Sequence, residues 1–87
     1  MTSKVFTINN KAGLHVRPAG CLVKAIQPFK CNVKMKFKDK EYNAKSILGI
    51  MSACIESGEE VEFIADGEDE NAALDAIAEA VASGLGE

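Results

Sequence analysis

One histidine stands in a stretch of residues that could bind and carry an anionic group. His15 follows Gly13-Leu14 and precedes Val16-Arg17-Pro18, where a loop is expected to run into a helix. A proline suits the first turn of a helix, because its missing N–H would have no partner there. Free backbone N–H groups and the positive end of the helix dipole then lie beside the imidazole and favour an anion. The guanidinium of Arg17 adds bidentate donors for phosphate oxygens.

The chemistry of His15 favours carriage of a phosphoryl group over hydrolysis. A neutral imidazole is nucleophilic near pH 7, and a phosphorylated imidazole is a reactive phosphoryl donor. No Asp or Glu lies near His15 in sequence to form a local catalytic dyad, and a single His excludes a His-rich metal site. The three cysteines form no Cys-x-x-Cys pair, so we expect neither a metal nor a cofactor. On residue types alone, a surface histidine that happens to precede a helix remains the simpler alternative.

Hydropathy periodicity predicts the elements that must position this histidine. Alternating residues predict strands at 4–8, 33–38 and 61–65, with a short strand at 41–43 after a turn at Asp39-Lys40. In 33–38 the alternating polar residues are all lysines, so one face of the sheet is expected to be covered and the other exposed to water. Helices are predicted from Pro18 to Gln27, from Ser46 towards Gly58, and from Asp69 to Gly84, with core stripes of Ala19, Leu22, Val23, Ile26 in the first and Leu74, Ile77, Ala78, Val81 in the last.

The order of these elements predicts an α+β fold. The βαββαβα sequence, with one strand wet on a single side, favours a two-layer open-faced α/β sandwich. A four-stranded antiparallel sheet is then covered on one side by the helices. With 87 residues and no long linker, we expect a single domain over 1–87.

The net charge of −3 conceals a strong asymmetry along the chain. All ten Lys and Arg residues lie in 1–45, while eleven of the thirteen Asp and Glu residues lie in 46–87. We expect a basic patch around His15, bordered by Arg17, Lys24 and Lys45, that docks acidic partner surfaces on an otherwise acidic molecule. The longest aliphatic stretch, 47–51, is too short to cross a membrane, and the first residues contain no apolar signal core. We therefore expect a cytoplasmic protein that neither inserts into membranes nor binds nucleic acid directly.

Two stretches at a fixed separation carry a resemblance to a known family. Gly13-Leu14-His15-Val16-Arg17-Pro18-Ala19 and Lys45-Ser46-Ile47-Leu48-Gly49-Ile50-Met51-Ser52 closely resemble HPr, the histidine-containing phosphocarrier family of the bacterial phosphoenolpyruvate:sugar phosphotransferase system. The resemblance covers essentially the whole chain. It implies a monomeric carrier without catalytic turnover, which takes a phosphoryl group from enzyme I onto Nδ1 of His15 (a pros-phosphohistidine) and passes it to enzyme IIA domains. It also implies that the Arg17 guanidinium follows the phosphoryl group through transfer.

Ser46 matches the position that an HPr kinase/phosphorylase phosphorylates in many members of the family. A catabolite-control transcription factor is then a further implied partner. From the residues alone, Ser46 is expected to cap the second helix, and capping by itself would explain the serine. A phosphate there would add a charge of about −1.5 to −2 beside an apolar surface.

The second predicted helix has more apolar residues than one buried stripe needs. Ile50 and Cys54 suit the core, whereas Ile47 and Leu48 are expected to be exposed and to dock partners. Met51 could belong to either set, and we assign it to docking together with Ile47 and Leu48.

Two residues depart from the usual family pattern. Ala12 replaces a polar residue, which predicts a more mobile loop before His15, and Gly20 inside the first helix costs roughly 0.5–1 kcal/mol relative to alanine.

Two other functions compete with the carrier function. One alternative is a regulatory binding module acting through Ser46 and the docking helix. The weaker alternative is a small enzyme on a ferredoxin-like sandwich, such as an acyl-phosphate hydrolase.

Overall fold

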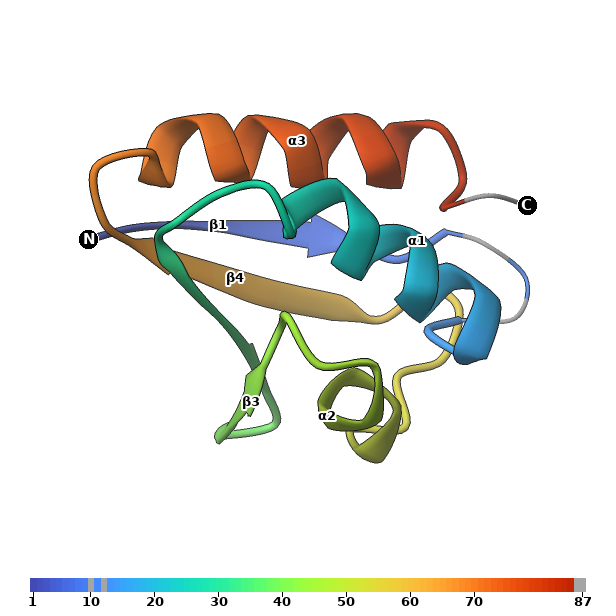
Figure 1. Cartoon of the computed structure of the whole chain (residues 1–87). Coiled ribbons are helices and arrows are strands. Elements are labelled where there is room, and N and C mark those ends of the chain that lie inside the picture. The colour runs from blue at the N-terminus through green and yellow to red at the C-terminus, as the bar shows by residue number, and fades with distance from the viewer. Residues whose placement is uncertain (10, 12, 86–87) are drawn as a thin grey trace.

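Four strands form one antiparallel sheet in the order β1-β4-β2-β3, which the computed structural model describes for residues 1–9, 11 and 13–85. Figure 1 shows α1 and α3 lying side by side over the sheet. The short helix α2 contacts α1 on the side away from α3. The element order βαββαβα and the α+β sandwich predicted from the sequence are confirmed. The elements are β1 (Thr2–Thr7), α1 (Val16–Ile26), β2 (Asn32–Phe37), β3 (Lys40–Asn43), α2 (Ile47–Ser52), β4 (Glu60–Asp66) and α3 (Glu70–Ala82).

The helices cover one face of the sheet and leave the other open. Along β2, Asn32, Lys34 and Lys36 are exposed while the residues between them are buried. The predicted one-sided sheet is therefore confirmed, and β4 lies inside it between β1 and β2. The covered face presents Val33, Met35, Phe37, Val61, Phe63 and Ala65 to the buried Ala19, Leu22, Ile26, Leu74 and Ile77 of the helices.

Several element boundaries differ from the predicted ones by one or two residues. The turn between β2 and β3 is formed by Lys38 and Asp39, whose φ angles are 51° and 64°. It thus begins one residue before the predicted Asp39-Lys40 turn. The first helix begins at Val16 rather than Pro18, and its C-cap, Gln27, directly precedes Pro28 as expected.

The predicted extent of the second helix is wrong. Helix α2 ends at Ser52, and Cys54 adopts φ 54°, a left-handed conformation that a continuing α-helix does not allow. Cys54 is consequently exposed and outside the core, whereas Ile55 is buried. The backbone from Ile55 to Glu59 instead accepts hydrogen bonds from Leu14 and Ile8: the Leu14 N–H donates to the Ile55 carbonyl (3.0 Å) and the Ile8 N–H to the Glu59 carbonyl (2.9 Å).

Asp69 stands at the N-cap position of α3 but does not cap it with its side chain. Its two carboxylate oxygens accept instead from the backbone N–H groups of Lys30 (2.8 Å) and Cys31 (2.9 Å). The Lys30 N–H in particular holds the pKa of the Asp69 carboxyl below its usual value. This clamp ties the start of α3 to the connection between α1 and β2.

Helix α3 turns a different stripe to the core than the sequence predicts. Leu74 and Ile77 are buried as expected, but Ala73 and Ala80 complete the stripe in place of Ala78 and Val81, which are half-buried. Gly84, with φ 85°, ends the helix as predicted. No helix in the described part of the chain is long and apolar enough to cross a membrane.

Candidate functional site

His15 occupies the N-cap position of α1, with an extended backbone (φ −84°, ψ −168°) and an exposed side chain. The first bond of the helix runs from the Ala19 N–H to the His15 carbonyl at 2.8 Å. The N–H groups of Val16 and Arg17 come before this bond, and Pro18 has none. The imidazole makes no capping hydrogen bond, so these two N–H groups are left for an anion held at His15.

Gly13 and Leu14 hold the loop that carries His15 against residues 55–56. Leu14 is buried and its N–H donates to the Ile55 carbonyl. Gly13 has φ 66°, and a Cβ built on it would lie 2.4 Å from the Ile55 carbonyl oxygen and 2.8 Å from Cα of Glu56. Only glycine fits this close approach. The exposed imidazole therefore projects from a loop that is anchored against residues 55–56.

A cavity of about 300 Å³ lies beside the imidazole. Met51, predicted to dock partners, is half-buried and lines it. Cys54 and Glu56 also line it, and sequence reasoning missed both, because the predicted helix was carried on past Ser52. The full lining is Leu14, His15, Met51, Cys54, Ile55 and Glu56.

Ser46 caps α2 as predicted. Its Oγ accepts the backbone N–H of Gly49 at 3.1 Å, and its own backbone is extended (φ −116°, ψ 122°). The hydroxyl is thus placed at the first turn of α2, directly before the two apolar residues Ile47 and Leu48.

The exposed apolar residues predicted on α2 are joined by one from α1. Leu48 is 80% exposed, Ile47 38% and Val16 63%. Val16 and Gly20 share one face of α1, and Ile47 Cδ1 lies 4.0 Å from the point where a Cβ on Gly20 would stand. Val16, which directly follows His15, and Ile47 therefore lie along the same face of α1, and Leu48 follows Ile47. We call Val16, Ile47 and Leu48 the apolar patch. Sequence reasoning missed Val16, although its apolar side chain next to the helix start was the available signal.

Positive charge is less concentrated around His15 than predicted. Arg17 is exposed in the first turn of α1, but Lys24 lies in the last turn, about 13 Å along the helix axis from His15. The ammonium group of Lys45 donates to the backbone carbonyl of Phe29, beyond the same end of α1. Lys34 and Lys36 lie on the open face of the sheet. The structure therefore does not bring Lys24 and Lys45 to the imidazole.

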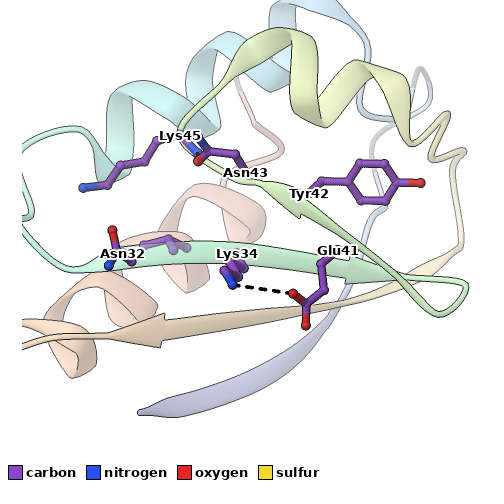
Figure 2. A pocket seen from close by; sticks show the side chains of 7 residues that line it. Asn32, Lys34, Glu41, Tyr42, Asn43 and Lys45 are labelled. Carbon is purple, nitrogen blue, oxygen red and sulfur yellow. Dashed lines mark hydrogen bonds and ion pairs between the residues drawn. The ribbon is translucent and has the colours of Figure 1, made fainter.

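A second hollow, of about 460 Å³, lies beside β2 and β3 and does not include His15. Figure 2 shows Lys34 and Glu41 pointing toward one another across it, where Lys34 Nζ and Glu41 Oε1 are 3.6 Å apart. The hollow is also lined by Asn32, Tyr42, Asn43 and Lys45. Among the residues that the structure describes, no group of three His, Cys, Asp or Glu side chains could hold a metal ion.

The fold and the site together define a small protein that presents one histidine at the N-terminus of a helix on an open-faced sandwich. Residues 2–83 match the family described as "PTS HPr component phosphorylation site". The chain belongs to this HPr family, so the resemblance seen in the sequence is confirmed.

Individual relatives agree with this assignment. The chain is 38% identical over 79 residues to the phosphocarrier protein HPr of Xylella fastidiosa, covering 91% of this chain and 89% of that protein. The crystal structure of HPr-C-His from Thermoanaerobacter tengcongensis superposes with a TM-score of 0.95 at 38% identity, covering 100% of this chain and 98% of that one. The chain also matches a multiphosphoryl transfer protein of Haemophilus influenzae at 36% identity, but spans only 17% of its length.

Family membership settles the class of activity. The chain is a phosphocarrier component of the phosphotransferase system and not a catalytic enzyme, as the sequence predicted.

Proposed function

We propose that His15 accepts a phosphoryl group from phosphorylated enzyme I and passes it to enzyme IIA domains, with the protein acting as a cytoplasmic monomer. The observation that carries this proposal is the position of His15: an exposed imidazole at the N-cap of α1, without a capping hydrogen bond. An imidazole that capped its own helix would have its nitrogen engaged.

The transfer needs only the residues at the start of α1. The Nδ1 lone pair of His15 attacks phosphorus, an N–P bond forms, and the bond from phosphorus to the donor breaks. The N–H groups of Val16 and Arg17 and the helix dipole stabilise the transferred oxygens. The Arg17 guanidinium, exposed in the same turn, supplies two parallel donors to them and follows the group to the acceptor. The second transfer runs the same bond changes with His15 as the leaving group.

The apolar patch is proposed to dock both partners. Val16, Ile47 and Leu48 are exposed, and Met51, half-buried, lines the cavity beside His15. Lys24 and Lys45 are proposed to contact acidic residues of a partner at the margin of this surface, near the end of α1 that is opposite to His15.

Ser46 is proposed as a regulatory phosphorylation site. Its hydroxyl caps α2 directly before Ile47 and Leu48, so a phosphate would place negative charge beside the apolar patch and weaken binding to acidic partners. An HPr kinase/phosphorylase and a catabolite-control transcription factor are the partners proposed for this site.

Labelling from phosphoenolpyruvate tests the carrier function. With enzyme I present, we expect an acid-labile phosphoryl group on the wild type and on Ser46→Ala, and none on His15→Ala. Absence of label from the wild type, or label that persists in His15→Ala, would contradict the proposal. An acid-stable label from ATP and the kinase, lost in Ser46→Ala but kept in His15→Ala, is the corresponding result for Ser46.

A further inference from the structure

Glu56 brings a carboxylate to the cavity that His15 lines. Its side chain is exposed, and it comes from the segment after α2 rather than from α1. Among the described residues that line this cavity, Glu56 alone carries a carboxylate. The others besides His15 are Leu14, Met51, Cys54 and Ile55. No ion pair joins it to a Lys or Arg in the part of the chain that the structure describes.

The backbone of Glu56 is held in fixed relation to the His15 loop. Its Cα lies 2.8 Å from the point where a Cβ on Gly13 would stand, and the neighbouring Ile55 carbonyl accepts the Leu14 N–H at 3.0 Å. The Glu56 carbonyl in turn accepts the Glu59 N–H at 3.2 Å. The loop that carries the imidazole and the residue that carries the carboxylate therefore cannot move far apart without breaking these contacts.

A phosphoryl group on His15 would add negative charge to the same small cavity. Like charges this close repel, and the repulsion acts on the phosphorylated state but not on neutral His15. We infer that Glu56 destabilises phosphorylated His15 relative to the free histidine and so raises its tendency to give the phosphoryl group away. This inference rests on His15 being the phosphorylated residue. Glu56 acts here through the charge it places beside His15 and takes no part in bond making.

An equilibrium measurement isolates this effect from docking. The protein is equilibrated with enzyme I and mixtures of phosphoenolpyruvate and pyruvate, and the phosphorylated fraction is measured by ³¹P NMR. The overall reaction moves one phosphoryl group from phosphoenolpyruvate to the His15 nitrogen and leaves pyruvate, with enzyme I regenerated. Its equilibrium constant does not depend on how well enzyme I docks, so a lost docking contact would not change it.

Glu56→Gln is expected to raise this equilibrium constant by roughly two- to fivefold, the range typical of exposed charge interactions, and Glu56→Lys by more. The matched control is Glu68→Gln, which removes the same charge from an exposed residue in the segment between β4 and α3. Figure 1 shows this segment at the opposite end of the sheet from the start of α1, so the substitution is expected to leave the equilibrium constant unchanged. At high salt the differences should shrink, because screening weakens exposed charges.

Two results would overturn the inference. Equal constants for wild type and Glu56→Gln would do so, and so would an equal shift in Glu68→Gln, which would show a general effect of net charge. In both cases the wild type is phosphorylated on His15 and the carrier function stands. A wild type that takes no label on His15 would instead contradict the proposed function itself, and the inference with it.

Discussion

Gly13 decides where the imidazole of His15 stands. Gly13→Ala is expected to lower the free energy of unfolding by about 2–3 kcal/mol, because alanine meets both a left-handed φ and a backbone contact. The φ is 66° and the contact is 2.4 Å from the new Cβ to the Ile55 carbonyl oxygen. Urea unfolding measures the loss, and the rate of phosphorylation should fall with it.

Gly58→Ala is the matched control for Gly13. Gly58 also has a positive φ, 90°, but a Cβ there would meet nothing within 4 Å. Its cost should be limited to the strained conformation, about 1 kcal/mol, with little effect on phosphorylation. Equal losses for the two variants would show that the contact with residues 55–56 does not hold the loop.

Gly20 offers the opposite expectation. It lies inside α1, and a Cβ there would meet only Ile47 Cδ1, at 4.0 Å, an ordinary contact. Gly20→Ala should therefore stabilise the protein by roughly 0.5–1 kcal/mol through the higher helix propensity of alanine. Thermal unfolding checks this, and a lower melting temperature would mean that α1 and α2 approach more tightly than the structure shows.

Some of the site could be predicted at the residue scale and some could not. The helix-start position of His15 and the capping of Ser46 depend on neighbours within four residues, and a sequence shows these directly. Cys54 and Glu56 reach the site only because Cys54 adopts a left-handed conformation, which has no sequence signal in a non-glycine residue. The mobility predicted from Ala12 falls outside the described residues.

At the scale of elements, the Asp69 clamp should make stability depend on pH. Its pKa is lower in the folded protein than in the unfolded chain, chiefly because the Lys30 N–H donates to the carboxylate. The ionised group therefore stabilises the fold above its unfolded pKa, and this contribution is lost as pH falls through the folded pKa.

Asp69→Asn keeps an oxygen that can accept a hydrogen bond but cannot ionise. We expect it to be less stable than the wild type at pH 7, with the difference shrinking toward pH 3 and below. Urea unfolding across this range measures the difference. A gap that stays constant with pH would show that the charge of Asp69 contributes nothing to the clamp.

The sheet was more predictable than the helix ends. In β2 and β4, the alternation of apolar and polar residues along the strand shows which face is covered, and this pattern is local in the sequence. The end of α2 depends instead on distant residues, because the chain after it must turn to form hydrogen bonds with Leu14 and Ile8. Similarly, Asp69 has the right type and place for an N-cap, but two N–H groups distant in sequence take its oxygens. Tertiary contacts of this kind override local preference.

At the scale of the whole molecule, the charge asymmetry of the sequence does not become a single basic face. The antiparallel sheet interleaves the two halves of the chain, because acidic β4 lies between β1 and lysine-rich β2. Lys34 pairs with Glu41, and Lys38 with Glu59. The residues that directly follow His15 are Val16 of the apolar patch and Arg17, and both are exposed. We therefore expect apolar contact to supply more of the binding energy than long-range attraction.

Leu48 tests this expectation. It is 80% exposed, so Leu48→Ala should leave stability unchanged while weakening binding to enzyme I by about 1–2 kcal/mol, or roughly 5–30-fold in affinity. Val5→Ala is the matched control, because Val5 is also an exposed aliphatic residue (59%) but belongs to β1, where it pairs with Glu62 on the open face of the sheet. Calorimetric titration of each variant with enzyme I gives the two affinities. If Val5→Ala weakened binding as much as Leu48→Ala, docking would have to involve the open face of the sheet. If raising the salt concentration abolished the wild-type affinity, docking would depend mainly on charge, since apolar contacts persist where exposed charges are screened.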